Sequence, residues 1–274
     1  MAFNENLNIF LKEFLVYNRY GFSAMASLGI KGLQGNNKFG QIISFDITDG
    51  RLPVWEEGTL YPYPTSAVTP SIASTDADDT LLGTGAQKVV VVGNDADGNP
   101  QQEEAEMDGQ NPVALTKSYS RIYRAYVSQT GTSGTAKGVI RVGELPFTLG
   151  IPNVTTYAQI FNGNNQTQMA IFTVPKGYTC FVTSITYTVV AGKPVIFHDE
   201  ARFKGSVFDT TKPFRNTRTI YVENTYTLQL EPYGKFPEHA DLQVTALATQ
   251  NGSSSEVAFR YILIPNTLLE ELGV

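Results

Sequence analysis

Stretches rich in β-branched and aromatic residues recur every ten to twenty residues between residues 88 and 264, and no helical periodicity separates them. With turn-forming residues between them, these stretches predict strands at 88–92, 118–127, 139–142, 169–174, 179–190, 194–204, 219–230, 241–249 and 256–264. A parallel sheet needs crossover helices, which the pattern lacks. We therefore expect a mainly β protein with antiparallel β-sandwich or jelly-roll-like domains.

The N-terminal part follows a different pattern. Apolar side chains with helical spacing occur at Phe3, Leu7, Phe10, Leu11, Phe14 and Leu15. This stripe predicts an amphipathic helix, which either packs on its own domain or docks on another chain. Residues 53–70 are rich in proline and aromatic residues, which favours an extended path laid across a surface. We take the helical stripe, together with Trp55, Tyr61 and Tyr63, as a candidate assembly interface.

Composition shifts divide the chain into three parts. We expect an N-terminal helix and extended arm over 1–64, a first β-sandwich domain over 65–150 and a second, jelly-roll-like domain over 151–274. The boundary between the two domains is placed at Gly150 to Asn153, just before a polar stretch. A short terminal helix is expected over 268–272, with Asn266 as its cap.

Charge and cysteine content exclude several classes of protein. The net charge is −6 and no basic run occurs, so nucleic acid is not an expected partner. No stretch of 18 apolar residues is present, so no membrane-spanning helix is predicted. Cys180 is the one cysteine, which excludes an internal disulfide and a multi-cysteine zinc site. It lies in an apolar run and is predicted to be a core residue.

Residues suited to catalysis are sparse. His198 precedes Asp199 and Glu200 on a predicted strand, and it is either a solvent-facing imidazole or a metal ligand or general base working with one of these acids. Glu103 and Glu104 are an acid pair, but nothing distinguishes them from solvated surface. No nucleophile elbow and no phosphate-binding loop is present. We therefore expect no catalytic residues, no cofactor and no enzymatic activity.

One loop comes close to a calcium-binding motif. Asp95, Asp97 and Asn99 occupy the first, third and fifth places of a twelve-residue calcium loop, and Glu106 occupies the twelfth. The sixth place is Pro100, where that loop needs glycine, and a strand precedes it instead of a helix. A solvated acidic hairpin is the main interpretation, and a weak calcium site is the alternative.

Several ordered segments resemble tailed-phage virion structural proteins. Residues 74–89 read Ser-Thr-Asp-Ala-Asp-Asp-Thr-Leu-Leu-Gly-Thr-Gly-Ala-Gln-Lys-Val, where an acidic step precedes Gly-Thr-Gly-Ala and a strand. Residues 103–109 resemble a glutamate strand entering an Asp-Gly turn, and residues 119–125 resemble an Arg-Ile-x-Arg strand. Residues 173–179, Thr-Val-Pro-Lys-Gly-Tyr-Thr, look like the entry of a jelly-roll-like domain. The similarity spans about residues 55–264.

This resemblance implies a non-enzymatic part of a virion, held as a head decoration, head appendage or tail component by contacts with capsid or tail proteins. It also implies a homo-oligomer, most simply a homotrimer, by analogy with virion β-sandwich proteins. The alternative is a receptor- or glycan-binding module of a tail appendage, in which Tyr and Asn side chains form a shallow site for a host surface glycan.

Overall fold

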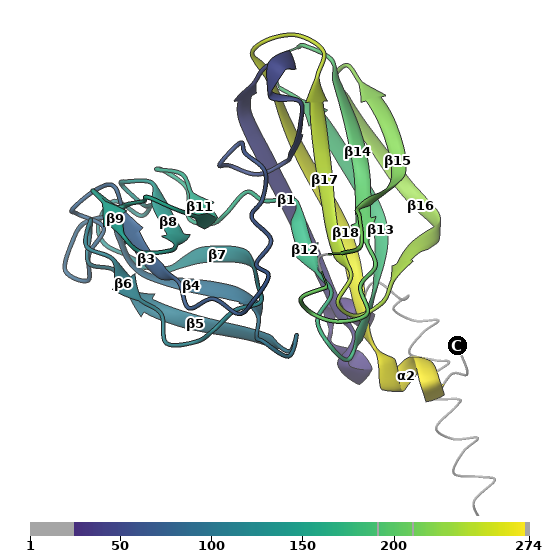
Figure 1. Ribbon diagram of the computed structural model, residues 1–274, viewed down its shortest axis with the longest axis horizontal. Helices are drawn as coiled ribbons and strands as arrows, with labels where there is room; N and C mark the ends of the chain where they lie inside the picture. Colours follow the sequence, from purple (N-terminus) through teal and green to yellow (C-terminus); the bar gives the residue numbers. More distant parts are fainter. Residues whose placement is uncertain (1–24, 191, 210, 272–274) are drawn as a thin grey trace, which may run out of the picture.

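A computed structural model describes residues 25–190, 192–209 and 211–271, with the side chains of 231–233 left aside. The described chain is mainly β, and its strand pairs are antiparallel, as expected. It folds into two lobes (Figure 1), one formed by the middle of the chain and one by its two ends. No helix in these residues is long and apolar enough to cross a membrane.

Two antiparallel sheets with one shared hydrophobic core make up the larger lobe, here called the two-sheet domain. The first sheet has the order β1 (Gln34–Phe45), β18 (Ser253–Pro265), β13 (Tyr178–Val189) and β16 (Thr225–Phe236). The second has the order β12 (Ile171–Thr173), β17 (Asp241–Ala248), β14 (Val195–Arg202) and β15 (Arg215–Val222), and β2 (Arg51–Pro53) also pairs with β17. The core is filled by alternating side chains of both sheets, and Cys180 is fully buried in it.

The alternation along β13 shows why these residues form this sheet. Ile185, Tyr187 and Val189 are buried toward the second sheet. Thr186 points the other way and its hydroxyl meets that of Thr227 on β16 at 3.0 Å. Because successive strand residues face opposite sides, a Thr at every second position leaves one face polar and the other free for the core.

The middle of the chain is inserted within a single strand of this domain. Two separate segments pair with the same strand, β17. Residues 51–53 lie opposite Leu247 to Thr245, and residues 171–173 continue in the same register opposite Gln243 to Asp241. At the break, Val54 donates its N–H to the Val244 carbonyl, whereas Ala170 accepts from the Val244 N–H. The two strand halves therefore complete one strand, and the chain between them, 55–169, leaves and returns at one point.

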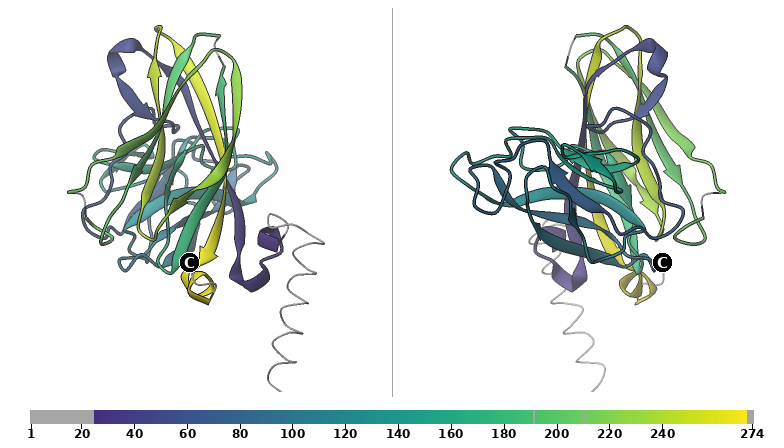
Figure 2. Two further views of the ribbon diagram at one scale, coloured as in Figure 1. Left: turned by 90° about the vertical axis from the view of Figure 1, so that its right-hand side faces the viewer. Right: turned by 60° about the vertical axis from the view of Figure 1, so that its left-hand side comes forward.

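Residues 55–169 form the second lobe, here called the inserted domain. A three-stranded sheet has the order β5 (Pro100–Glu106), β4 (Ala86–Asn94) and β7 (Arg121–Thr130). A four-stranded sheet has the order β11 (Thr156–Ile160), β8 (Ile140–Gly143), β3 (Ser71–Ser74) and β6 (Val113–Ala114), and β9 (Phe147–Thr148) pairs with β10 (Ile151–Pro152). The domain has its own core. In the two turned views of Figure 2 it lies against one side of the two-sheet domain.

A buried carboxylate organises the loops of the inserted domain. Asp79 is fully buried and accepts hydrogen bonds from the Ser74 hydroxyl and from the backbone N–H groups of Ala86, Lys137 and Gly138. A Cβ atom on Gly85 would lie 2.0 Å from the Asp79 carboxylate, so only glycine fits there. The Asp-Asp-Thr and Gly-Thr-Gly-Ala sequences within residues 78–86 thus stabilise the conformation of these loops.

These boundaries differ from the expected ones. Residues 34–45 and 51–53, expected within an extended arm, are strands of the two-sheet domain, and the expected boundary at residue 150 falls inside the inserted domain. A sequence read in order shows no sign that the two halves of one strand are 117 positions apart (54 to 171). Residues 219–230, expected as one strand, are β15 and β16 joined by a turn, and the terminal helix is α2 (Asn266–Glu271). The helical stripe lies outside the described residues: Phe3, Leu7, Phe10, Leu11, Phe14 and Leu15.

Candidate functional site

Aromatic rings from the proline-rich segment form a ladder at the junction of the two domains. Trp55 contacts Tyr61 edge to face with ring centroids 5.3 Å apart, Tyr61 lies 4.8 Å from Tyr63, and Tyr63 lies 5.3 Å from Phe214. Trp55 is 1% exposed, and the buried Tyr61 hydroxyl donates to the Ile122 carbonyl. The segment is extended, as expected, but Trp55 and Tyr61 are buried within the chain instead of facing another subunit, and Tyr63 is half-buried.

Beside this ladder, three cations surround one carboxylate. Asp241 is fully buried on β17, and Arg121 reaches it from β7 of the inserted domain with 3.1 Å between Nε and Oδ1. Arg202 contacts Oδ2 at 2.6 Å and Lys204 contacts the same oxygen at 2.9 Å. Thr173 adds a hydroxyl hydrogen bond of 2.7 Å. The carboxylate thus joins both domains through charge-assisted hydrogen bonds.

Backbone carbonyl groups and the face of an aromatic ring stabilise the excess positive charge of this cluster. Arg121 also donates to the carbonyl of Pro64, and Lys204 donates to that of Val207. The Arg202 guanidinium lies 4.4 Å from the centre of the Tyr63 ring. Burial lowers the pKa of Lys204 to about 8, although Asp241 opposes this shift. Burial alone would raise the pKa of Asp241, but the three cations outweigh it and hold that pKa below its usual value.

His198 does not pair with its acidic neighbour. It is buried rather than solvent-facing, and its Nδ1 lies 3.0 Å from the Thr219 hydroxyl. Asp199 instead accepts the Tyr187 hydroxyl and contacts Arg218 at 3.4 Å. Successive strand residues point to opposite faces, so the base–acid pair with Asp199, one of the two alternatives for His198, is not formed. Burial lowers the pKa of His198, and the positive charge of Arg51 adds to this effect.

Glu200, the other acid beside His198, is already occupied. Arg51 contacts one of its oxygens at 2.7 Å, and the Gln243 amide donates to the other at 2.7 Å. Across residues 25–190, 192–209 and 211–271, no three His, Cys, Asp or Glu side chains are grouped as a metal ion requires. The His198 segment therefore presents no assembled reactive centre.

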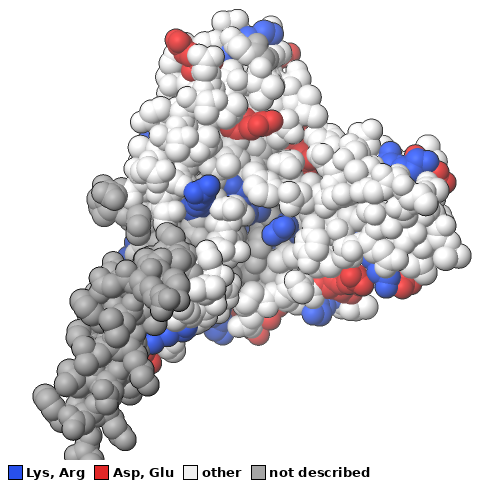
Figure 3. Space-filling model, turned by 180° about the vertical axis from the view of Figure 1, so that it is seen from behind, with Lys and Arg blue, Asp and Glu red and all other residues white. Residues whose placement is uncertain are grey.

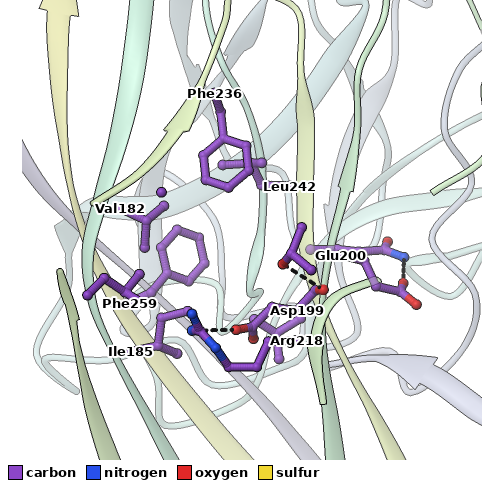
Figure 4. Close-up of a pocket in the computed structure, with 13 residues that line it drawn as sticks. Val182, Ile185, Asp199, Glu200, Arg218, Phe236, Leu242 and Phe259 are labelled. Atoms are coloured by element: carbon purple, nitrogen blue, oxygen red, sulfur yellow. Dashed lines mark hydrogen bonds and ion pairs between the residues drawn. The ribbon is translucent and has the colours of Figure 1, made fainter. Parts of the chain in front are cut away.

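A cavity of about 130 Å³ lies between the two sheets of the larger domain. Its walls are mainly apolar, with Phe236, Leu242 and Phe259 among them, and Asp199 and Arg218 form a polar end (Figure 4). Burial raises the pKa of Asp199 to about 6, although the Tyr187 hydroxyl and Arg218 stabilise its charged form. Since the polar groups are bonded to one another, the cavity is best described as part of the core.

The calcium motif is not assembled. Asp95 caps a tight hairpin turn, because its Oδ1 accepts the N–H groups of Asp97 and Asn99. Glu106 lies at the far end of β5, opposite Lys88, whereas the turn joins the other end of β4 and β5. Glu106 lies six positions after Pro100 along the strand, about 20 Å away at the usual rise. The acidic hairpin is the structure formed.

The acid pair on the same strand is divided between two faces. Glu103 accepts the N–H groups of Thr116 and Lys117, and Glu104 accepts the Ser128 hydroxyl. The two carboxylates therefore do not face each other across a cleft, as glycoside hydrolysis requires.

An open groove of about 430 Å³ lies where β1 faces the inserted domain, and it is here called the junction groove. No Asp or Glu in the part of the chain that the structure describes lines it. Its polar lining consists of amide, tyrosine and cationic side chains: Gln34, Asn36, Asn37, Lys38, Gln102, Tyr123, Arg124, Tyr126, Tyr178 and Tyr261. The face seen from behind in Figure 3 carries Lys and Arg side chains around the hollow between the two lobes, with Asp and Glu side chains above them.

Sequence reasoning missed the charged residues that matter most at the junction. Three of them lie at the ends of strands, where a charged residue ordinarily indicates a solvent-exposed position: Arg121, Arg202 and Asp241. Lys38 lies in a polar, glycine-containing stretch that predicts no strand. Contacts between segments distant in sequence accompany their burial, and no local pattern indicates such contacts.

No protein-family model and no curated protein matches this sequence. Among solved structures, the chain aligns with one titled as the structure of infectious bursal disease virus Gx strain, at 8% identity and a TM-score of 0.20, over 85% of this chain and 71% of that one. It also aligns with the VP2 subviral particle of infectious bursal disease virus, at 9% identity and a TM-score of 0.19, over 85% and 72%. At TM-scores this low the likeness carries no information about fold or function.

Proposed function

We propose that the two-sheet domain is a jelly roll and that the chain is a non-enzymatic structural protein of a tailed-phage virion. The strand order supports the first part. Counting β2 and β12 as one strand and numbering in chain order, the sheets read 1-8-3-6 and 2-7-4-5. This order corresponds to two Greek keys folded into facing sheets, the arrangement of jelly rolls.

The same strand order is the observation that carries the functional proposal. Jelly rolls are used by viral capsid proteins, by lectins and by cupins. The segment resemblance to phage virion proteins favours the first of these uses, and a protein–protein role on the head or tail follows. A non-enzymatic role is supported by the acids near His198, because Asp199 and Glu200 are bonded to Tyr187, Arg51 and Gln243.

A homo-oligomer, most simply a homotrimer, is part of this proposal. It is supported by one hairpin of the inserted domain, residues 144–155, which displays four large apolar side chains: Leu145, Leu149, Ile151 and Val154. Leu149 is 68% exposed and Val154 is 67% exposed. Apolar side chains gathered in this way are typical of surfaces that contact another protein.

Particles purified from a culture that produces the chain would test the virion proposal. Gold-labelled antibody against the chain should decorate intact heads or tails in electron micrographs, and absence from particles of a chain that is abundant in the lysate would contradict it. A variant lacking residues 1–24 tests whether the N-terminal segment docks the protein. Deleting residues 1–40 would be unsuitable, because it would also remove more than half of β1.

The second candidate function is a receptor- or glycan-binding module. The junction groove favours it, since Tyr126 and Tyr178 lie there with the amides of Asn36 and Asn37. Such a groove offers flat rings and paired donors and acceptors in one place.

A further inference from the structure

The junction groove has an unusual charge for this protein. The whole chain carries a net charge of −6, yet among the described residues the groove is lined by two cations, Lys38 and Arg124, and by no carboxylate. Arg124 is exposed and its guanidinium lies 5.2 Å from the centre of the Tyr126 ring. The groove therefore presents a local positive potential on an acidic protein, which attracts anionic ligands.

Lys38 is the more informative of the two cations. Only 5% of it is exposed, its Nζ donates to the Tyr123 carbonyl, and the same ring lies 5.7 Å from Nζ. No carboxylate of the described residues lies within ion-pair distance of it. A buried ammonium without a counter-charge is energetically costly, and burial together with the charge of Arg124 lowers the pKa of Lys38 to about 7. An anion entering the groove would supply the missing partner.

The remaining lining indicates what else the ligand carries. Asn36, Asn37 and Gln102 offer side-chain amides, each of which both donates and accepts, so they suit hydroxyl groups. Tyr126 and Tyr178 offer rings that cover the flat apolar face of a small cyclic molecule. The volume of about 430 Å³ lies within the usual range for small-ligand sites.

We propose that the junction groove binds an acidic saccharide, with the carboxylate of a uronic-acid-type sugar between Lys38 and Arg124 and its hydroxyls on the amides. This inference rests on the second candidate function above. An acidic peptide shares the charge, but the amide and tyrosine lining favours a polyhydroxylated ligand over one that needs only counter-charges.

Isothermal titration calorimetry on the purified full chain tests this inference. The probes are hexagalacturonate and a hexameric guluronate, with maltohexaose as the neutral sugar and hexaglutamate as the acidic peptide. We expect at least one uronate to bind at least tenfold more tightly than maltohexaose and hexaglutamate. Arg124→Gln and Lys38→Met should each weaken that binding about tenfold, whereas Lys235→Met, an exposed lysine on β16, should leave it unchanged.

A pH series gives a second readout. The charged and titratable groups facing Lys38 from β7 and β18 are Arg124, Tyr123 and Tyr261, and burial raises the pKa of both tyrosines, away from the range between pH 6 and 8.5. A carboxylate beside Lys38 raises its pKa, so uronate binding should take up a proton and weaken as the pH rises through this range. The pH dependence should disappear in Lys38→Met and persist in Arg124→Gln.

Equal binding of maltohexaose, tighter binding of hexaglutamate, or no uronate binding at millimolar concentration would each overturn the inference. If Lys38→Met does not fold, the titration of Arg124→Gln alone tests the inference, because Arg124 is exposed and its substitution should not affect folding. A failed titration leaves the virion proposal standing, since that proposal is tested on particles.

Discussion

Asp241 shows how a single buried residue can hold two domains together. Replacing it with Asn would leave Arg121, Arg202 and Lys204 buried without their counter-charge. We expect Asp241→Asn to lower the free energy of unfolding by roughly 3–5 kcal/mol, the usual cost of removing one partner from a buried ion pair. Urea unfolding followed by the fluorescence of Trp55, the one tryptophan, would measure this loss. Asp108→Asn, at an exposed position, is the matched control, and equal effects of the two substitutions would refute this account.

Replacing Lys38, unlike replacing Asp241, should stabilise the protein. Its pKa of about 7 lies below the ordinary value of 10.5, so between these pH values the unfolded chain binds a proton that the folded chain has released. Stability therefore rises with pH across this window, and the full penalty is present below pH 7. We expect Lys38→Met to raise the free energy of unfolding by roughly 2–4 kcal/mol at pH 6 and by less at pH 9.5.

Urea titrations of Lys38→Met at these two pH values would measure the difference, with Lys235→Met as the exposed control. A gain that is the same at both pH values would show that the substitution acts through packing alone.

At the scale of elements, the split strand makes a sharp prediction. Because Val54 and Ala170 share one position opposite Val244, deleting residues 55–170 and joining Val54 to Ile171 keeps the register along β17. The shortened chain should fold cooperatively, as seen by circular dichroism and thermal melting. Deleting only 55–169 leaves one extra residue, which turns every following side chain of the strand to the wrong face.

These two deletions differ by one alanine, so composition cannot explain a difference between them. Similar melting of the two deleted chains, or loss of folding in both, would contradict the interpretation of β2 and β12 as one strand.

Strand periodicity predicts most of the elements but not all of them. The stretches that become β4, β13, β14, β17 and β18 are recognisable because apolar residues alternate or run together in them. β1 is not, since Gln34 to Gly40 is polar and contains two glycines. It forms a strand because β18 offers a long antiparallel partner, and Ile42 and Phe45 reach the core.

At the scale of the whole molecule, the proposed oligomer can be weighed directly. A homotrimer has three times the 30.0 kDa of the chain, about 90 kDa, and light scattering on the purified protein at micromolar concentration would measure it. A double substitution, Leu149→Asp with Val154→Asp, should give the monomer mass, because it places charges on the apolar hairpin.

Val190→Asp, at an exposed apolar site of the two-sheet domain, is the control and should leave the oligomer intact. A wild-type chain that is monomeric at this concentration would contradict the proposed homotrimer.

The amino-acid sequence is enough to predict that the chain is mainly β with antiparallel strands, that Cys180 is buried and that the aromatic segment is extended, because each depends on local periodicity or on backbone restrictions. Three features come from tertiary packing alone: Ile171 completes the strand that contains Val54, Trp55 and Tyr61 are buried inside the chain, and no carboxylate of the described residues pairs with Lys38. These features arise when segments distant in sequence pack together. Burial and charge pairing depend on that packing, which residues adjacent in the chain do not encode.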